Sequence, residues 1–297
     1  MDTLNLRVVA RYHVAARYTA IQEGGYFTQD KKTASMALRV AARYKQKKKV
    51  RSEDGGETTV YVYSAKQIQH RNREKSKRLE KLSKSIKDLR SKVKKDLRSS
   101  DPETMLLALC LALINETGER VGNETSAEEA GHFGVTGLQK KHVSFKPNGV
   151  FLKYVGKSGV EHKRKISDTG IRKALKDAYE AADDDDSCLF HWDEGKVTAS
   201  KVNSYLSDFG DLTAKDLRGF RANILMLEKL KEIRGKGGKL PEDKKERETK
   251  LKAEFKEALE GTASEIQHTP KILEDSYLTP GLAEAYKKDG TIVSDLI

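Results

Sequence analysis

The chain has 297 residues, of which 37% are hydrophobic and 34% charged, and its 57 Lys and Arg against 45 Asp and Glu give a formal net charge of +12. This composition supplies enough apolar material for a hydrophobic core and excludes wholesale disorder. No run approaches the roughly 18 apolar residues that a membrane-spanning helix requires, and no charged-then-apolar leader opens the chain, so we expect neither a membrane partner nor secretion.

The two cysteines, Cys110 and Cys188, are too few for a disulfide framework or a multi-cysteine zinc site. A reducing compartment is therefore expected. We predict an intracellular location, in the cytoplasm or nucleoid or, for a viral protein, in the virion or the infected cell.

The positive charge is concentrated in the first third of the chain. Residues 1–100 hold 26 basic and 10 acidic residues, a balance of +16, whereas the remainder holds 31 basic and 35 acidic residues, a balance of −4. Lysine and arginine displace condensed counterions from nucleic-acid phosphates, so a basic third is a candidate nucleic-acid-binding region. A solvated, lysine-rich helix that keeps the protein soluble is the alternative interpretation.

The first third is expected to be mostly helical. Short alanine-rich basic helices are predicted over 6–20 and 34–49, then a polar break over 51–57 and a β-branched strand over 58–63. A long basic helix is predicted over 65–98, because its apolar residues recur at helical spacing: Leu79, Leu82, Ile86, Leu89 and Val93.

The remainder combines helices with three strands. A capping aspartate followed by proline starts a helix at Asp101-Pro102, and because 105–114 is apolar nearly all round, we expect this helix at the centre of a core. A glycine-rich loop with a short helix follows over 116–137. Strands are predicted over 143–145, 150–155 and 160–166, with a hairpin turn at 156–159 between the last two.

Further helices are predicted over 168–182, 199–208 and 214–234, after a start at Thr213, and over 242–260, a highly charged segment considered as a projecting element. Another short helix starts at Thr269-Pro270. The pattern predicts an α+β, mostly helical fold, in which a helical domain with a small three-stranded antiparallel sheet is preceded by a basic N-terminal module.

Four segments in chain order carry candidate chemistry. They are Arg120-Val121-Gly122-Asn123-Glu124, Gly156-Lys157-Ser158-Gly159, Lys215-Asp216-Leu217-Arg218, and His268-Thr269-Pro270 with Tyr277 nine positions after the histidine. Each segment alone is a weak signal, since a lone arginine, turn lysine or tyrosine is usually a surface or packing residue.

Together the segments resemble the catalytic domain of type IB DNA topoisomerases of the poxvirus and bacterial kind, supported by Phe133-Gly134-Val135-Thr136-Gly137-Leu138 and by Lys140-Lys141-His142-Val143. The resemblance covers about 65–285. It implies a topoisomerase IB-like catalytic domain over 101–297, a DNA-gripping remainder over 56–100, and a basic extension of unknown role over 1–55.

The resemblance also implies the roles of the residues. Tyr277 would form a covalent 3′-phosphotyrosyl intermediate, Arg120, Arg218 and His268 would bind the scissile phosphate, and Lys157 would protonate the leaving 5′-oxygen. Further DNA contacts are predicted at these positions: Lys140, Lys141, Lys215, Arg221 and Asn223. Arg221 could equally be a surface charge.

The expected partner is double-stranded DNA, clamped by a monomer, and the expected activity is relaxation of supercoils without ATP, cofactor or metal. The acidic run Asp183–Asp186 lacks a calcium-loop pattern, and no phosphate-binding nucleotide loop occurs.

Two alternatives remain: a tyrosine recombinase, although recombinases usually have histidine where Lys215 stands, and a non-catalytic DNA-binding protein on the same scaffold. One departure from the family is Gly219 after Arg218, which costs a helix roughly 1 kcal/mol against alanine.

Overall fold

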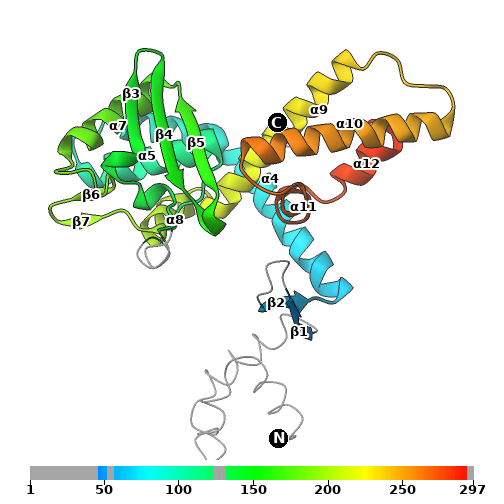
Figure 1. The fold of residues 1–297 in the computed structure, drawn as a ribbon, viewed down its shortest axis with the longest axis horizontal. Helices are drawn as coiled ribbons and strands as arrows, with labels where there is room; N and C mark the ends of the chain where they lie inside the picture. Colours follow the sequence, from blue (N-terminus) through cyan, green and yellow to red (C-terminus); the bar gives the residue numbers. More distant parts are fainter. Residues whose placement is uncertain (1–45, 52–56, 123–126, 128–130, 293–297) are drawn as a thin grey trace, which may run out of the picture. The chain divides into compact units, whose positions relative to one another are not determined.

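The computed structural model describes residues 46–51, 57–122, 127 and 131–292, and the chain divides into two units, residues 1–74 and 75–297 (Figure 1). In the first unit, β1 (Gln46–Arg51) pairs antiparallel with β2 (Glu57–Val62). The strand predicted over 58–63 is confirmed. The helix predicted over 34–49 is wrong for residues 46–49, which belong to β1, because pairing with the neighbouring strand β2 decides the structure of this lysine-rich segment and its own composition does not reveal that pairing.

The predicted helix over 6–20 and most of the one over 34–49 lie outside the described residues. The long basic helix is confirmed as α4 (Ala65–Asp96), and its predicted apolar stripe, from Leu79 to Val93, is buried. The predicted domain boundaries after residues 55 and 100 remain predictions.

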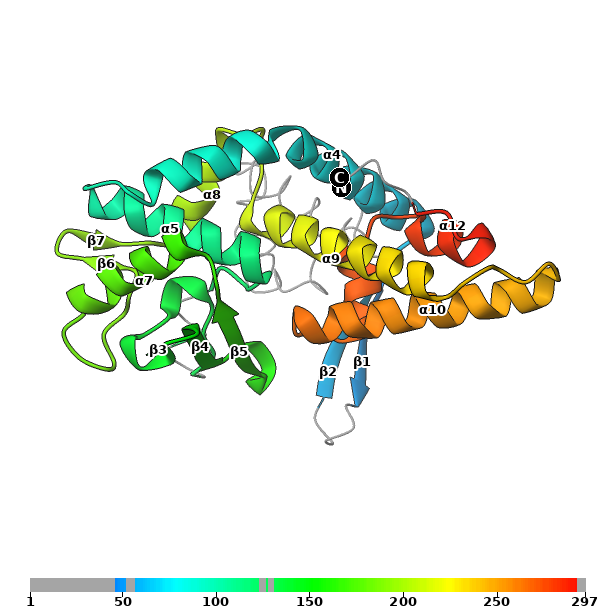
Figure 2. The same cartoon turned by 90° about the horizontal axis from the view of Figure 1, so that it is seen from above.

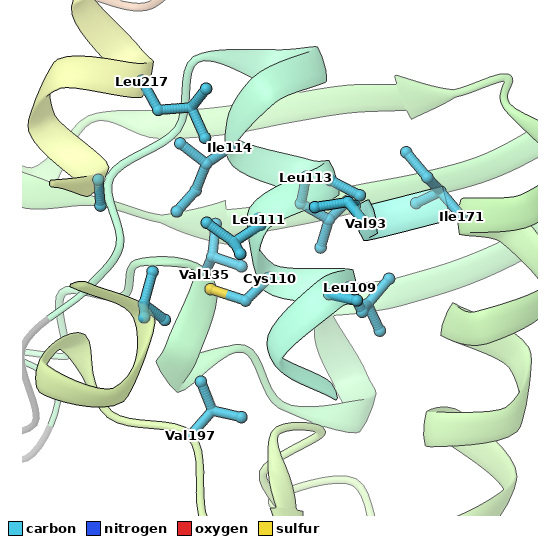
Figure 3. Close-up of a cluster of buried hydrophobic side chains, with 14 of the residues drawn as sticks. Val93, Leu109, Cys110, Leu111, Leu113, Ile114, Val135, Ile171, Val197 and Leu217 are labelled. Carbon is cyan, nitrogen blue, oxygen red and sulfur yellow. The ribbon is translucent and has the colours of Figure 1, made fainter. Parts of the chain in front are cut away.

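Helix α5 (Pro102–Thr117) is the central helix of the second unit, as predicted. Asp101 caps it by accepting a hydrogen bond from the Thr104 backbone N–H, and Pro102 occupies the first turn. Every residue from Leu106 to Ile114 except Leu107 is buried, and Figure 3 shows several of these side chains among Val93, Val135, Ile171 and Leu217. Since burial of one such side chain contributes about 1.5–3 kcal/mol, α5 anchors the core.

The predicted three-stranded antiparallel sheet is confirmed, with β3 (Val143–Lys146), β4 (Gly149–Val155) and β5 (Glu161–Ile166) in that order. Tyr154 of β4 lies opposite His162 of β5. Residues 157–159 form the tip of the hairpin between these strands, so the predicted turn is confirmed. A second, two-stranded hairpin joins β6 (His191–Trp192) and β7 (Gly195–Lys196), which the sequence analysis did not predict.

The predicted helices of the C-terminal half are confirmed within a few residues. They are α7 (Thr169–Ala181), α8 (Ala199–Ser207), α9 (Ala214–Lys236), α10 (Lys244–Glu265) and α11 (Pro270–Ile272). A π-helical turn over Leu273–Tyr277 and α12 (Leu282–Asp289) follow, and neither was predicted. The α+β, mostly helical fold is therefore confirmed. None of the helices in the described ranges is long and apolar enough to cross a bilayer.

Helix α10 does not project. It packs against α9 and α12, because Leu251, Phe255 and Ala258 form a buried stripe at helical spacing within its charged sequence (Figure 2).

Helix α9 belongs to two hydrophobic clusters at once. Its first two turns, including Leu217 and Phe220, pack into the cluster that contains α5, the three-stranded sheet, α7 and α8. Its later residues, from Ala222 to Leu230, pack with α10, the π-helical turn and α12. The change from one cluster to the other falls between Phe220 and Ala222, about one helical turn after Arg218, so α9 carries this residue close to the junction of the two groups of elements.

Replacing Gly219 by alanine tests this packing. A Cβ at this position would lie 3.9 Å from Leu79 Cδ2 and from Tyr277 Cδ1, which is ordinary contact. We expect Gly219→Ala to raise the free energy of unfolding in urea by about 1 kcal/mol, because alanine is the better helix former. The matched Gly118→Ala should lower it, since Gly118 has φ 69° and its Cβ would lie 3.1 Å from Ile266 Cγ2. A destabilised Gly219→Ala protein would contradict this account of α9.

Candidate active site

Four of the five predicted catalytic residues line one cavity of about 560 Å³ in the second unit, and the fifth, His268, contacts two of them. The segments that form the cavity are far apart in the sequence. The lining residues are Arg120, Val121, Gly122, His132, Phe133, Gly134, Lys157, Ala214, Lys215, Arg218 and Tyr277.

Arg218 is the most buried of the predicted catalytic residues, with 4% of its surface exposed. Its Nε donates to the Gly118 carbonyl at the C-terminal end of α5, and its Nη1 donates to the Tyr277 hydroxyl at 2.7 Å. The guanidinium carbon lies 5.1 Å from the centre of the Tyr277 ring. Burial lowers the pKa of Arg218 to about 10, so the side chain stays charged at neutral pH.

Arg120 is held by a tight backbone crossing. The Arg120 carbonyl accepts from the Val135 N–H at 2.9 Å, and the Val121 carbonyl accepts from the Thr136 N–H at 2.7 Å. A Cβ on Gly134 would lie 2.4 Å from the Gly122 Cα, so only glycine allows the two segments to approach this closely. The crossing fixes the backbone of Arg120 and of the two residues that follow it.

His268 connects Arg120 to the tyrosine. The His268 Nδ1 lies 3.5 Å from Arg120 Nη2, and the ring centres of His268 and Tyr277 are 4.8 Å apart. An arginine can only donate, so Nδ1 accepts and a neutral ring carries its proton on Nε2. His268 Nε2 and Arg218 Nη2 are both buried and have no hydrogen-bond partner among the described residues. Two buried donors beside the cavity therefore have unused hydrogen-bonding capacity.

The His268 ring is neutral under ordinary conditions. Burial, and then the positive charges of Arg218 and Arg120, lower the pKa of His268 to about 3. A neutral ring donates one hydrogen bond from Nε2 without adding a charge to a site that already contains two guanidinium groups.

Tyr277 is the last residue of a π-helical turn, in which the Leu278 N–H donates to the Leu273 carbonyl at 3.1 Å. Such turns are rare and are frequent at functional sites. Asn223 of α9, which is fully buried, secures the turn: its Nδ2 donates to the carbonyls of Gly219 and Tyr277 at 2.8 and 2.9 Å, and its Oδ1 accepts from the Thr279 N–H and hydroxyl at 2.8 and 2.9 Å. Since all its hydrogen-bonding capacity is used, these contacts favour a positioning role for Asn223 over the predicted phosphate contact.

Lys157 and Lys215 are exposed at the edge of the cavity. Lys157 stands at the tip of the β4–β5 hairpin, and Lys215 lies in the first turn of α9, where the Thr213–Asp216 capping box sets the start of the helix. Their exposure leaves both ammonium groups accessible to a phosphate backbone.

The other predicted DNA contacts do not line this cavity. Lys140 donates to the Ala182 carbonyl at 2.6 Å, and Lys141 pairs with Asp186 in the exposed acidic run after α7. Arg221 donates to the Glu116 carbonyl at 3.1 Å and faces Glu265. Their roles in DNA binding remain predictions.

Three polar residues behind the cavity were missed by the sequence analysis. Glu119 precedes Arg120 in the chain, and its carboxylate contacts His162 at 2.6 Å and Arg164 at 2.5 Å. The available signal was the period-2 pattern of β5, which places 162 and 164 on the same face as the buried Ile166. Among the described residues, no group of three or more His, Cys, Asp or Glu side chains is arranged to hold a metal ion.

Comparison with known proteins identifies the family of the chain. Residues 64–288 match the family described as eukaryotic DNA topoisomerase I, catalytic core. The chain therefore belongs to the type IB DNA topoisomerase family, as the motifs predicted.

Viral and cellular enzymes are among its relatives. DNA topoisomerase 1B of Acanthamoeba polyphaga mimivirus is 27% identical over 244 residues, which cover 77% of this chain and 69% of the relative. DNA topoisomerase I of Monkeypox virus is 24% identical over 228 residues, 76% of this chain and 68% of the relative. DNA topoisomerase 1 of Schizosaccharomyces pombe is 28% identical over 156 residues, 52% of this chain and only 19% of that longer protein.

A solved structure of the XerH site-specific recombinase bound to its difH substrate is also similar, with a TM-score of 0.40 and 16% identity over 91% of this chain and 68% of that chain. A similarity of this degree supports no argument about function.

Replacing Asn223 tests its role at the tyrosine. In Asn223→Ala, the Tyr277 carbonyl and the Thr279 N–H lose their partners, so we expect the free energy of unfolding to fall by about 1–3 kcal/mol. We also expect the rate of any reaction at Tyr277 to fall, whereas affinity for DNA stays within about twofold. Urea denaturation and filter binding measure the two effects. A weakened affinity with unchanged stability would instead support a direct phosphate contact.

The pKa of His268 offers a second test. In the free protein we expect the ring to remain neutral through the physiological pH range in an NMR titration. Arg120→Ala removes one of the charges that oppose protonation, so it should raise the pKa of His268 from about 3 toward the ordinary 6.5. Lys176→Ala, on the exposed side of α7, serves as the control and should leave the titration unchanged. A wild-type ring that titrates near 6.5 would contradict the assigned environment.

Proposed function

We propose that this protein relaxes supercoiled duplex DNA by transient cleavage of one strand through a 3′-phosphotyrosyl intermediate. The observation that carries the proposal is the 2.7 Å hydrogen bond between the Arg218 guanidinium and the Tyr277 hydroxyl, in a cavity that Arg120 and Lys157 also line. A nucleophile, phosphate-binding cations and a general acid are the groups that a phosphodiester transesterification requires.

In the proposed cleavage step, the phosphoryl group passes from the 5′-oxygen of the DNA to the Tyr277 oxygen. The Tyr277 oxygen attacks the phosphorus as its proton passes to solvent water, the bond from phosphorus to the 5′-oxygen breaks, and Lys157 supplies the proton that the leaving oxygen takes up. The same step in reverse, with the 5′-hydroxyl as nucleophile, reseals the strand. Because the tyrosyl ester keeps the phosphodiester energy, no ATP is consumed.

The charge that develops at phosphorus would be stabilised by the protein. The planar forks of Arg120 and Arg218 can each bind nonbridging oxygens through two hydrogen bonds, and the free Nε2–H of His268 can add another. Loss of one preorganised donor of this kind typically costs roughly 2.7–4 kcal/mol of transition-state stabilisation. With two guanidinium groups and an ammonium group at the phosphate, the proposed chemistry requires no divalent metal ion.

The basic first third of the chain supports duplex DNA as the substrate. We propose that the protein acts as a monomer that closes around the duplex, with affinity dominated by phosphate contacts and therefore sensitive to salt. Both positive and negative supercoils would relax, since torque drives rotation about the uncut strand. The viral relatives support a site of action in a virion, an infected cell or another compartment that contains DNA.

Relaxation of supercoiled plasmid in EDTA tests the proposal. The wild-type protein should relax both signs of supercoil, and Tyr277→Phe should abolish relaxation while it still binds DNA, because only the nucleophilic oxygen is removed. Tyr179→Phe makes the same change on α7 and should relax plasmid at the wild-type rate. A wild-type protein that leaves plasmid supercoiled at every salt concentration, or that exchanges strands between two duplexes, would contradict the proposal.

A further inference from the structure

A buried charged cluster lies directly behind the cavity. The side chains of Glu119 and His162 are each 2% exposed, and Glu119 Oε2 lies 2.6 Å from His162 Nδ1. The second carboxylate oxygen lies 2.5 Å from Arg164 Nε, and the Tyr154 ring stacks on the His162 ring with centres 4.8 Å apart. The cluster thus joins the segment after α5 to strands β4 and β5.

Glu119 is ionised in this environment. Burial opposes its ionisation, but the contact with His162 and the charge of Arg164 outweigh burial and hold the pKa of Glu119 below its ordinary value. A buried ion pair often contributes little to stability compared with apolar residues of the same volume, because both charges lose their hydration. Stability alone therefore explains the cluster poorly, and its position suggests what else it does.

The cluster connects two of the proposed catalytic residues. Glu119 is the chain neighbour of Arg120. At the other end, His162 supports the hairpin: a Cβ on Gly156 would lie 2.4 Å from His162 Nε2, so the glycine backbone rests directly on the ring. The Gly156 N–H donates to the Val160 carbonyl at 2.8 Å and closes the turn whose next residue is Lys157.

We propose that Glu119 and His162 are positioning residues that hold the Lys157 hairpin in register with Arg120, and so direct the ammonium group at the leaving 5′-oxygen. Neither side chain lines the cavity, so both act through Lys157 and neither touches the DNA. The inference rests on the proposed function, because it names the residues that orient the general acid of that same site.

Changing the leaving group of the substrate distinguishes a positioning role from a merely structural one. An alkoxide leaving group needs a proton, whereas a thiolate leaves without one because the pKa of a thiol is only about 8.5. Replacing the bridging 5′-oxygen of an oligonucleotide by sulfur should therefore rescue any variant whose defect is loss of the general acid. General acid catalysis is typically worth about 10²–10⁴-fold, which sets the size of the effect for Lys157→Ala.

We expect Glu119→Gln to slow single-turnover cleavage of the oxygen substrate by about 10–100-fold. The variant should cleave the sulfur substrate at a rate within about threefold of wild type, because only the orientation of Lys157 is lost. Lys157→Ala should show the same pattern more strongly. Arg120→Ala should be slow on both substrates, since a phosphate contact is needed for either leaving group. Glu161→Gln, which changes an exposed carboxylate on β5 next to His162, should cleave both at the wild-type rate.

Gly156→Ala provides a second variant that leaves every charge in place. The added methyl group should push the hairpin away from His162 and reproduce the oxygen-selective defect even if Glu119→Gln proves unstable. Equal losses on both substrates, or no loss, in Glu119→Gln and Gly156→Ala would overturn the positioning role while Lys157 remains the acid. If Lys157→Ala is itself not rescued by sulfur, the assignment of the general acid fails, and the positioning role fails with it.

Discussion

The hydrogen bond from Arg218 to the Tyr277 hydroxyl depends on the rest of the fold being in place. One side of the guanidinium is fixed by the Gly118 carbonyl at the end of the most buried helix, α5, and the other side reaches the tyrosine 59 positions further along the chain. A charged group with 4% exposure is stable only where its hydrogen bonds are largely satisfied. The core around α5 and the helices around α10 must therefore both be folded before this contact can form.

Helix α9 brings the two groups of elements together. Because it packs with the sheet and α5 at one end and with α10 and α12 at the other, the site is assembled at the junction of two hydrophobic clusters, where neither cluster alone contains all of the proposed catalytic residues. Arg120 and Lys157 lie on segments whose neighbouring residues pack into the first cluster, and His268 and Tyr277 lie on segments that pack into the second. This arrangement gives two buried polar residues the positioning roles proposed above, Asn223 for the tyrosine and Glu119 for the hairpin.

Sequence patterns predicted the elements that depend on local signals. Three features are encoded by residues next to one another in the sequence, and the structure confirms them: the capped start at Asp101-Pro102, the apolar stripe of α4 and the glycine turn before Lys157. The pattern failed where contact with another element decides the structure. The lysine-rich β1 becomes a strand by pairing with β2, and α10 was considered as a projecting helix because its buried stripe is hidden among charges. For the site, the family motifs predicted which side chains would lie together. They could not show that Asn223 uses all its hydrogen-bonding capacity within the protein or that Glu119 pairs with His162. Those contacts depend on burial and on atoms from other segments, which spacing along the chain does not encode.

The most direct test of the account is to trap the covalent intermediate and locate it. A duplex whose cleaved end is too short to remain paired should accumulate the protein–DNA adduct, and mass spectrometry of its peptides should place the DNA on Tyr277, attached through a 3′-phosphate. An adduct at another residue, a 5′-phosphate linkage, or no adduct from a folded protein that binds the duplex would contradict the central claim that these buried contacts exist to direct the Tyr277 oxygen at phosphorus.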